Sequence, residues 1–89
     1  MKKSPSVAFF YKKIRTTGKD ELETYLRNAP LNYNELQFML NVIEGYTNTE
    51  LSYLHQKSRS RVAQIKRELF TRLHAYEIRK EHLAKLKSL

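Results

Sequence analysis

Apolar residues recur at helical intervals in every long stretch between the few glycines and prolines of this chain. Near the N-terminus they follow the spacing i, i+3, i+4, i+7, which places them on one face of an α-helix. These residues are Val7, Phe10, Tyr11 and Ile14. No stretch alternates between apolar and polar residues for long enough to predict a β-strand. The chain of 89 residues is therefore predicted to be a small all-α domain.

The first two helices have recognisable ends. Ser4-Pro5 predicts an N-cap followed by proline at the first helical position. After a break at residues 16–18, a second helix is expected from about Lys19 to Asn28. It should stop before Pro30, because the residue preceding a proline disfavours helical backbone angles. Its inward residues are Leu22, Tyr25 and Leu26. Residues 1–30 are thus predicted to form an N-terminal helical extension.

Two capping boxes mark the next two helices. Asn32 precedes Glu35 by three residues, and Thr47 precedes Glu50 by the same spacing, so each pair can satisfy two backbone N–H groups. Gly45 supplies a natural end for the first of these helices. That helix carries the apolar stripe Leu36, Met39, Val42 and Ile43. The second helix is short, and its inward residues are predicted to be Leu51 and Leu54.

A longer, basic helix follows. Ser58 can cap it, and apolar residues then repeat at intervals of 3, 4 and 4 on its inward face. These residues are Val62, Ile65, Leu69 and Leu73. Since no glycine or proline follows Gly45, the helix is expected to continue nearly to the C-terminus. A helix of about ten residues, a short capped helix, a brief turn and a longer basic helix is the order of a helix-turn-helix.

The net charge of +8 is concentrated in the second half of the chain. Residues 1–45 hold seven Lys/Arg and five Asp/Glu, a balance of +2, whereas residues 46–89 hold ten and four, a balance of +6. A basic half favours a polyanionic partner, because binding to phosphates releases counterions. Residues 57–72 contain six basic side chains and one acid, Glu68, whereas a purely solvated helix more often interleaves opposite charges.

Other classes of function find no support in the sequence. There is no cysteine, and the three histidines share no ligand spacing, so we expect no metal site. A glycine-rich phosphate loop and a nucleophile–base pair are also missing, so we expect neither an enzyme nor a cofactor. The apolar run from Val7 to Tyr11 is five residues long. A signal-peptide core needs roughly 7–15 apolar residues and a membrane span about 20, so a cytoplasmic protein is predicted.

A further pattern runs without a gap through residues 31–74. It comprises Leu31, Glu35, Glu44-Gly45, Thr47, Asn48, Glu50-Leu51, Ser58, Val62, Ile65, Leu69 and Arg72-Leu73. In this register the stretch resembles the LuxR/GerE-type DNA-binding domain of bacterial transcription regulators, and sigma-factor promoter-reading domains share much of the pattern. The resemblance covers 74 − 31 + 1 = 44 of 89 residues. It implies a helix-turn-helix core that binds double-stranded DNA with the helix at about 59–73 in the major groove.

The outward face of that helix agrees with this implication. At 100° per residue, Ser60, Gln64, Arg67 and Thr71 point directly away from the core. Arginine and glutamine match the edges of guanine and adenine, and a small alanine allows close approach to a thymine methyl group. We therefore assign base reading to Ser60, Ala63, Gln64 and Arg67. Phosphate contacts are assigned to Thr47, Asn48, Lys57, Ser58, Arg59, Arg61 and Lys66. The simpler alternative is a solvated helix or a contact with an acidic protein.

Several residues depart from the family pattern. The family usually has leucine at the position of His55, an aliphatic residue at that of Lys57 and alanine at that of Ser52. We expect His55 to be a partly buried packing residue and Leu54 to take over the apolar contact. Lys57 should then direct its ammonium group to solvent or phosphate while its stem packs on the protein. The core beside the short helix should be thinner as a result.

The C-terminal segment, residues 75–89, is predicted to be a helix that can contact a second copy or another regulator. The family's dimer helix usually begins after a glycine near His74, and that glycine is missing here. An apolar seam is present but is interrupted by Arg79, Lys80 and Lys87. The seam consists of Tyr76, Leu83, Leu86 and Leu89.

Two functions remain consistent with the sequence. The first is a sequence-specific double-stranded DNA-binding transcription regulator, located in the cytoplasm on the bacterial nucleoid. The second is a small helix-turn-helix interaction protein that modulates another regulator or RNA polymerase by protein–protein contact. Phe9 and Phe10 are expected to cover the first helix of the motif, and a role for Phe9 as a partner contact is the alternative. Neither a membrane nor a small-molecule substrate is expected as a partner.

Overall fold

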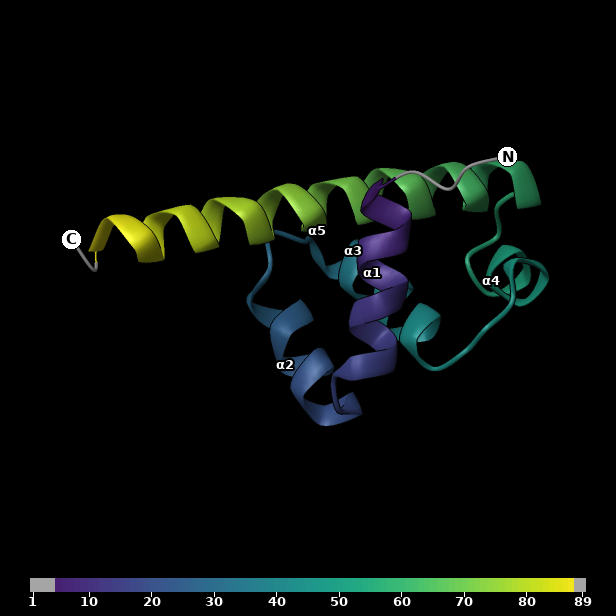
Figure 1. Cartoon of the computed structure of the whole chain (residues 1–89). Helices are drawn as coiled ribbons and strands as arrows, with labels where there is room; N and C mark the ends of the chain where they lie inside the picture. The colour runs from purple at the N-terminus through teal and green to yellow at the C-terminus, as the bar shows by residue number, and fades with distance from the viewer. Residues whose placement is uncertain (1–4, 88–89) are drawn as a thin grey trace.

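The computed structural model describes residues 5–87, and this part of the chain is helical without any strand. The helices are α1 (Pro5–Thr16), α2 (Lys19–Asn28), α3 (Tyr33–Ile43), α4 (Asn48–Leu54) and α5 (Arg59–Lys87), shown in Figure 1. The all-α prediction is confirmed. The predicted cap Ser4 and the seam residue Leu89 lie outside the described residues. Within residues 5–87, none of the helices combines the length and apolar character that crossing a membrane requires.

The longest helix, α5, organises the others. It runs along one edge of the molecule and α1 crosses it, while α2 and α3 lie on the same side of α5 as α1 (Figure 1). The short α4 lies beside the first turns of α5, and the last turns of α5 extend beyond α2 (Figure 1). The helix is unbroken at residues 74 and 75. The expectation that the basic helix continues nearly to the C-terminus is therefore confirmed, and the predicted C-terminal helix is the last part of α5.

Aromatic rings hold α1 against α5. The ring of Phe10 is fully buried and stacks on Phe70 of α5, with ring centroids 4.7 Å apart. Tyr11 meets the same ring edge-on at 5.5 Å, and Phe9 stacks on His74 at 4.6 Å. These ring partners all belong to α5, whereas the sequence predicted that α1 would cover α3. The difference arises because Phe70 adjoins Leu69 and widens the buried face of α5 toward α1.

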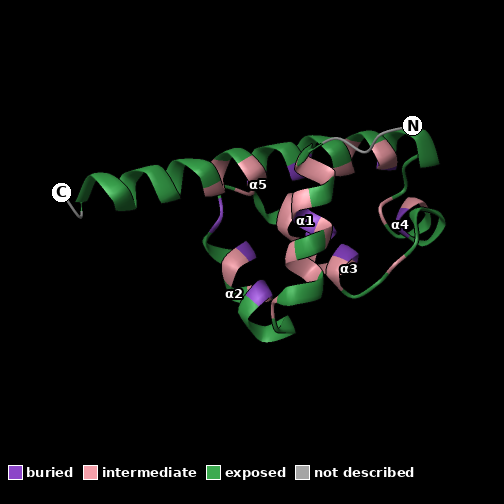
Figure 2. Cartoon of the chain, in the orientation of Figure 1, coloured by how far each residue is buried: buried purple, intermediate pink, exposed green. Residues whose placement is uncertain are grey.

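The rest of the core joins the facing sides of the helices, as the buried positions in Figure 2 show. Beyond Phe10 and Phe70, the buried apolar residues are Leu22, Leu26, Ala29, Phe38, Met39, Val42, Leu51, Val62, Leu69 and Leu73. Most of them were predicted from helical spacing. Phe38 was not, although it is only 3% exposed. Phe38 precedes Val42 by four residues, so helical spacing does place it on the inward face of α3, and its ring contacts that of His55 at the end of α4.

The predicted helix ends are formed by local hydrogen bonds. Asn32 Oδ1 accepts from the Glu35 backbone N–H at 2.8 Å, and Glu35 Oε1 accepts from the Asn32 N–H at 3.0 Å. Thr47 and Glu50 repeat this reciprocal arrangement at 3.1 and 3.0 Å. Gly45 has a φ of +95°, the left-handed conformation that closes α3. Both capping boxes and the glycine stop are therefore confirmed.

The inward face of α4 differs from the prediction. Leu51 is fully buried as expected, but Leu54 is 55% exposed, so the prediction that it faces inward is wrong. His55 takes that place: its ring lies 5.2 Å from that of Phe38, and its Nε2 is 3.0 Å from Asn41 Oδ1. The expectation of a partly buried packing histidine is confirmed. The physical reason is that α3 offers His55 both an aromatic face and a hydrogen-bonding partner, whereas Leu54 lines an open hollow with Tyr46 and Tyr53.

The turn between α4 and α5 contains a residue in the left-handed region. Gln56 has a φ of +53°, a conformation that costs an L-residue roughly 1–2 kcal/mol. We expect Gln56→Gly to raise the free energy of unfolding by about 0.5–1 kcal/mol, because relief of this strain outweighs the greater backbone entropy of glycine in the unfolded chain. Urea denaturation followed by circular dichroism measures the change. Gln64→Gly, in the interior of α5, is the control and should instead lower stability by about 1 kcal/mol. A Gln56→Gly protein no more stable than the wild type would contradict the prediction.

Candidate nucleic-acid interface

The first half of α5 has one open face. Ser60, Gln64, Arg67 and Thr71 are all exposed, on the side of the helix opposite its buried residues. Ala63, at the edge of this face, is half-buried. α1 and α4 pack against the other side of α5 and leave the outward residues uncovered. The structure thus brings three of the predicted base-reading residues, Ser60, Gln64 and Arg67, together on the exposed face of α5. The fourth, Ala63, lies at the edge of that face.

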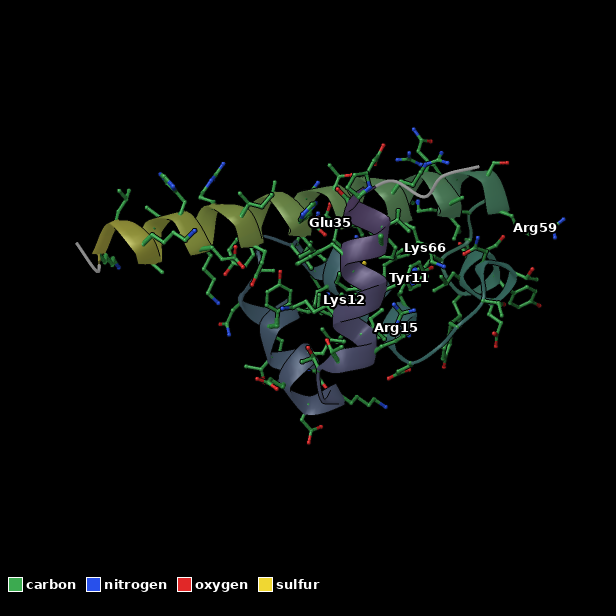
Figure 3. The ribbon with its side chains drawn as sticks, in the orientation of Figure 1. Tyr11, Lys12, Arg15, Glu35, Arg59 and Lys66 are labelled. Carbon is green, nitrogen blue, oxygen red and sulfur yellow. The ribbon has the colours of Figure 1, made fainter. Side chains whose placement is uncertain are left out.

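The beginning of α5 is capped and carries unpaired cations. The Ser58 hydroxyl oxygen accepts the Arg61 backbone N–H at 3.1 Å, which confirms Ser58 as the cap. Arg59, the first residue of α5, projects away from the protein in Figure 3. Lys57, Arg59 and Arg67 are exposed, and none of them has an acidic partner within residues 5–87. Their charges are therefore available to an anionic ligand.

Two other arginines of α5 are paired with carboxylates. Arg61 lies 3.9 Å from Glu68, and both side chains are about half exposed, so this ion pair is weak. Arg72 donates to Glu35 Oε1 at 2.6 Å and links α5 to α3. The pKa of the Glu35 carboxyl group is lowered, chiefly by the hydrogen bond from the Asn32 backbone and further by Arg72. Arg61 can exchange its partner for a phosphate, whereas Arg72 is part of the protein's own structure.

Lys66 and Asn48, both predicted phosphate contacts, bind each other. Lys66 Nζ donates to Asn48 Oδ1 at 2.7 Å, across the boundary between α5 and α4. Lys66, labelled in Figure 3, is half-buried, and burial lowers the pKa of its ammonium group. This hydrogen bond fixes the start of α4 relative to α5. It also places one positive charge beside the predicted contact at the α4 N-terminus.

The N-terminus of α4 is the least favourable of the predicted phosphate contacts. The Thr47 backbone N–H already donates to the Glu50 carboxylate, and the Thr47 hydroxyl oxygen accepts the Glu50 N–H. A phosphate at this point would face the negative charge of Glu50. The hydroxyl hydrogen of Thr47 is still able to donate to a phosphate oxygen. Because the Glu50 carboxylate would repel the phosphate, such a contact depends on the positive charge of Lys66 to offset it.

A pocket of about 190 Å³ lies between α3, the turn after α4 and α5. Phe38, Ile65 and Leu69 line its apolar part, and the Lys57 and Arg61 side chains lie at it as well. It lies beside the end of α4, where the sequence predicted a thinner core. The two cations beside the pocket are both predicted phosphate contacts.

The chain matches no family model, no curated protein and no solved structure. Within residues 5–87, no three or more His, Cys, Asp or Glu side chains are grouped so that they could hold a metal ion. What distinguishes the surface is the exposed face of α5, with Gln64 and Arg67 at its centre and unpaired cations at its start.

Proposed function

We propose that the protein is a sequence-specific double-stranded DNA-binding transcription regulator that inserts the first half of α5 into the major groove. The observation that carries the proposal is the exposed face of α5, on which Gln64 and Arg67 have no partner within residues 5–87 that would have to be displaced. The major groove of B-DNA, about 12 Å wide, admits an α-helix. The open side of α5 meets this requirement because α1 and α4 lie on its other side.

The proposed contacts fall into two groups. Arg67 can donate two hydrogen bonds to the O6 and N7 atoms of a guanine, and Gln64 can pair with the N6 and N7 atoms of an adenine. Ser60 and Ala63 border these two side chains. Lys57, Arg59 and Arg61 surround the start of α5 and would hold the phosphate backbone on either side of the groove. The phosphate contacts supply affinity, and the base contacts supply sequence preference.

Assignment to the LuxR/GerE type is part of the proposal. It is supported by the ungapped pattern in residues 31–74 and by the succession of a capped α3, a short capped α4 and a basic α5. A regulator of this type would act in the cytoplasm, on the bacterial nucleoid.

The test is fluorescence anisotropy with two duplexes, one selected from a random pool and one unselected, at two or more salt concentrations. We expect the wild-type protein to bind both at low salt and to prefer the selected duplex. If it has no affinity for either duplex at low salt, the DNA-binding proposal fails, and the interaction protein that modulates another regulator or RNA polymerase becomes the better hypothesis.

Lys57→Ala tests the phosphate contacts in the same assay. We expect it to weaken binding to both duplexes similarly and to reduce the slope of log affinity against log salt by about 1, because one fewer counterion is released. Lys19→Ala is the matched control, since Lys19 is an exposed lysine at the start of α2, and α2 lies away from the first half of α5 in Figure 1. An unchanged salt slope for Lys57→Ala would remove Lys57 from the interface.

A further inference from the structure

The last turns of α5 have no cover within the described part of the chain. Every residue from 78 to 87, here called the α5 tail, is exposed, as Figure 2 shows. Its exposed residues include three large apolar side chains: Ile78 is 55% exposed, Leu83 is 50% exposed and Leu86 is 53% exposed. A helical segment of about ten residues is marginal in water without tertiary contacts. The tail therefore gains stability from any surface that covers these side chains.

The α5 tail is also strongly basic. It contains Arg79, Lys80, Lys85 and Lys87 against the single acid Glu81, a balance of 4 − 1 = +3. An apolar surface of neutral or negative charge would complement it.

A surface of that kind lies on α4. Tyr46, Thr49, Glu50, Tyr53 and Leu54, here called the α4 patch, line a hollow of about 360 Å³. Tyr53 is 88% exposed and Leu54 is 55% exposed, although large apolar groups are usually covered when they adjoin one another.

The segment that carries the α4 patch has a charge opposite to that of the protein as a whole. Residues 28–56 contain no lysine or arginine and three glutamates, in a chain of net charge +8. Glu50 lines the patch, and Glu44 precedes Tyr46 by two residues. Both are exposed, and neither forms an ion pair with a basic side chain within residues 5–87. The α4 patch is thus apolar and contains the Glu50 carboxylate, while Lys66 is bonded to Asn48 at the start of the helix. It meets the requirement of an apolar surface with an acidic group.

We propose that the α5 tail of one copy of the protein packs on the α4 patch of another copy. Within one chain the two surfaces lie at opposite ends of a molecule whose longest dimension is 48 Å, so a helical tail cannot reach its own patch (Figure 1). Between copies, Leu83 and Leu86 cover Tyr53 and Leu54, as in the docking of an amphipathic helix in an apolar groove. The basic residues of the tail then lie near Glu44 and Glu50.

This contact uses neither the base-reading face nor the start of α5, and it does not rest on the proposed function. It also differs from a symmetric dimer in which two tails pack on each other, because each contact joins two different surfaces. That difference makes a complementation experiment decisive.

The experiment uses sedimentation velocity on two variants of the full chain. Tyr53→Ser/Leu54→Ser removes the patch and keeps the tail, and Leu83→Ser/Leu86→Ser does the reverse. All four residues are half exposed or more, so neither variant disturbs the core. We expect the wild type to self-associate between about 10 µM and 1 mM, and each variant to associate at least about tenfold more weakly. An equimolar mixture of the two variants should form a one-to-one complex, because one tail and one patch remain intact.

Several results would overturn the proposal. The first is that the wild type stays monomeric at every concentration. The second is that the Tyr53→Ser/Leu54→Ser variant still self-associates through its tail, and the third is that the two variants do not combine when they are mixed. Higher salt should weaken the mixed complex, because the tail and the patch carry opposite charges. Tyr33→Ser is the matched control: Tyr33 is 75% exposed on α3 outside the patch, and its loss should leave self-association unchanged.

Discussion

Phe10→Ala is expected to lower the free energy of unfolding of the whole domain by about 3–5 kcal/mol. Phe10 is fully buried and stacks on Phe70 at 4.7 Å, so the substitution removes both the buried ring and its stacking contact with Phe70 and leaves a cavity between α1 and α5. Domains of this kind are stable by only about 5–15 kcal/mol, so the variant would be close to unfolding at room temperature. Urea denaturation monitored by circular dichroism measures the loss.

This substitution also tests how residues 1–30 relate to the rest of the chain. If α1 and α5 share one core, the variant unfolds in a single transition with a lower midpoint. If residues 1–30 are a dispensable extension, α1 separates first and the midpoint for α3 to α5 stays at the wild-type value, which would contradict the prediction. Phe9→Ala is the control, because Phe9 is a neighbouring phenylalanine that is only partly buried, and it should lose clearly less stability.

Arg67→Ala is expected to weaken binding to the selected duplex by about 1–3 kcal/mol, or about 5–150-fold, while binding to an unselected duplex changes little. The reason is that a bidentate contact to guanine exists only on the selected sequence. Arg67→Lys should not restore the preference, since an ammonium group lacks the planar pair of donors. Anisotropy titrations of both duplexes at one salt concentration measure the two affinities.

Arg15→Ala is the matched control for Arg67→Ala. Arg15 is an exposed arginine on α1, and Figure 3 places it on the part of that helix remote from α5. Its loss should leave the preference between the duplexes unchanged. Equal weakening of both duplexes by Arg67→Ala would make Arg67 a phosphate contact and would withdraw it from base reading.

The helix boundaries near the middle of the chain were predictable because their causes are local. In each capping box, a side chain bonds a backbone group three residues away, as Asn32 does with Glu35 and Thr47 with Glu50. Gly45 ends α3 through its own backbone conformation. The outward position of Gln64 and Arg67 follows from helical geometry once the inward residues of α5 are known. The sequence by itself therefore determined the helices and the composition of the exposed face of α5.

Contacts between distant residues depended on the tertiary structure. Arg72 forms a hydrogen bond with Glu35, 37 residues away in the sequence, and Lys66 forms one with Asn48, 18 residues away. No rule of helical spacing predicts such pairs. The packing of α1 against α5 depends on Phe70, which contacts Phe10 and Tyr11. Phe70 was not among the residues predicted to face inward. Likewise, only the surroundings offered by α3 turned His55 inward and left Leu54 exposed. Local hydrogen bonds and periodicity are properties of a short segment, whereas the choice of neighbour between segments is made when the helices pack.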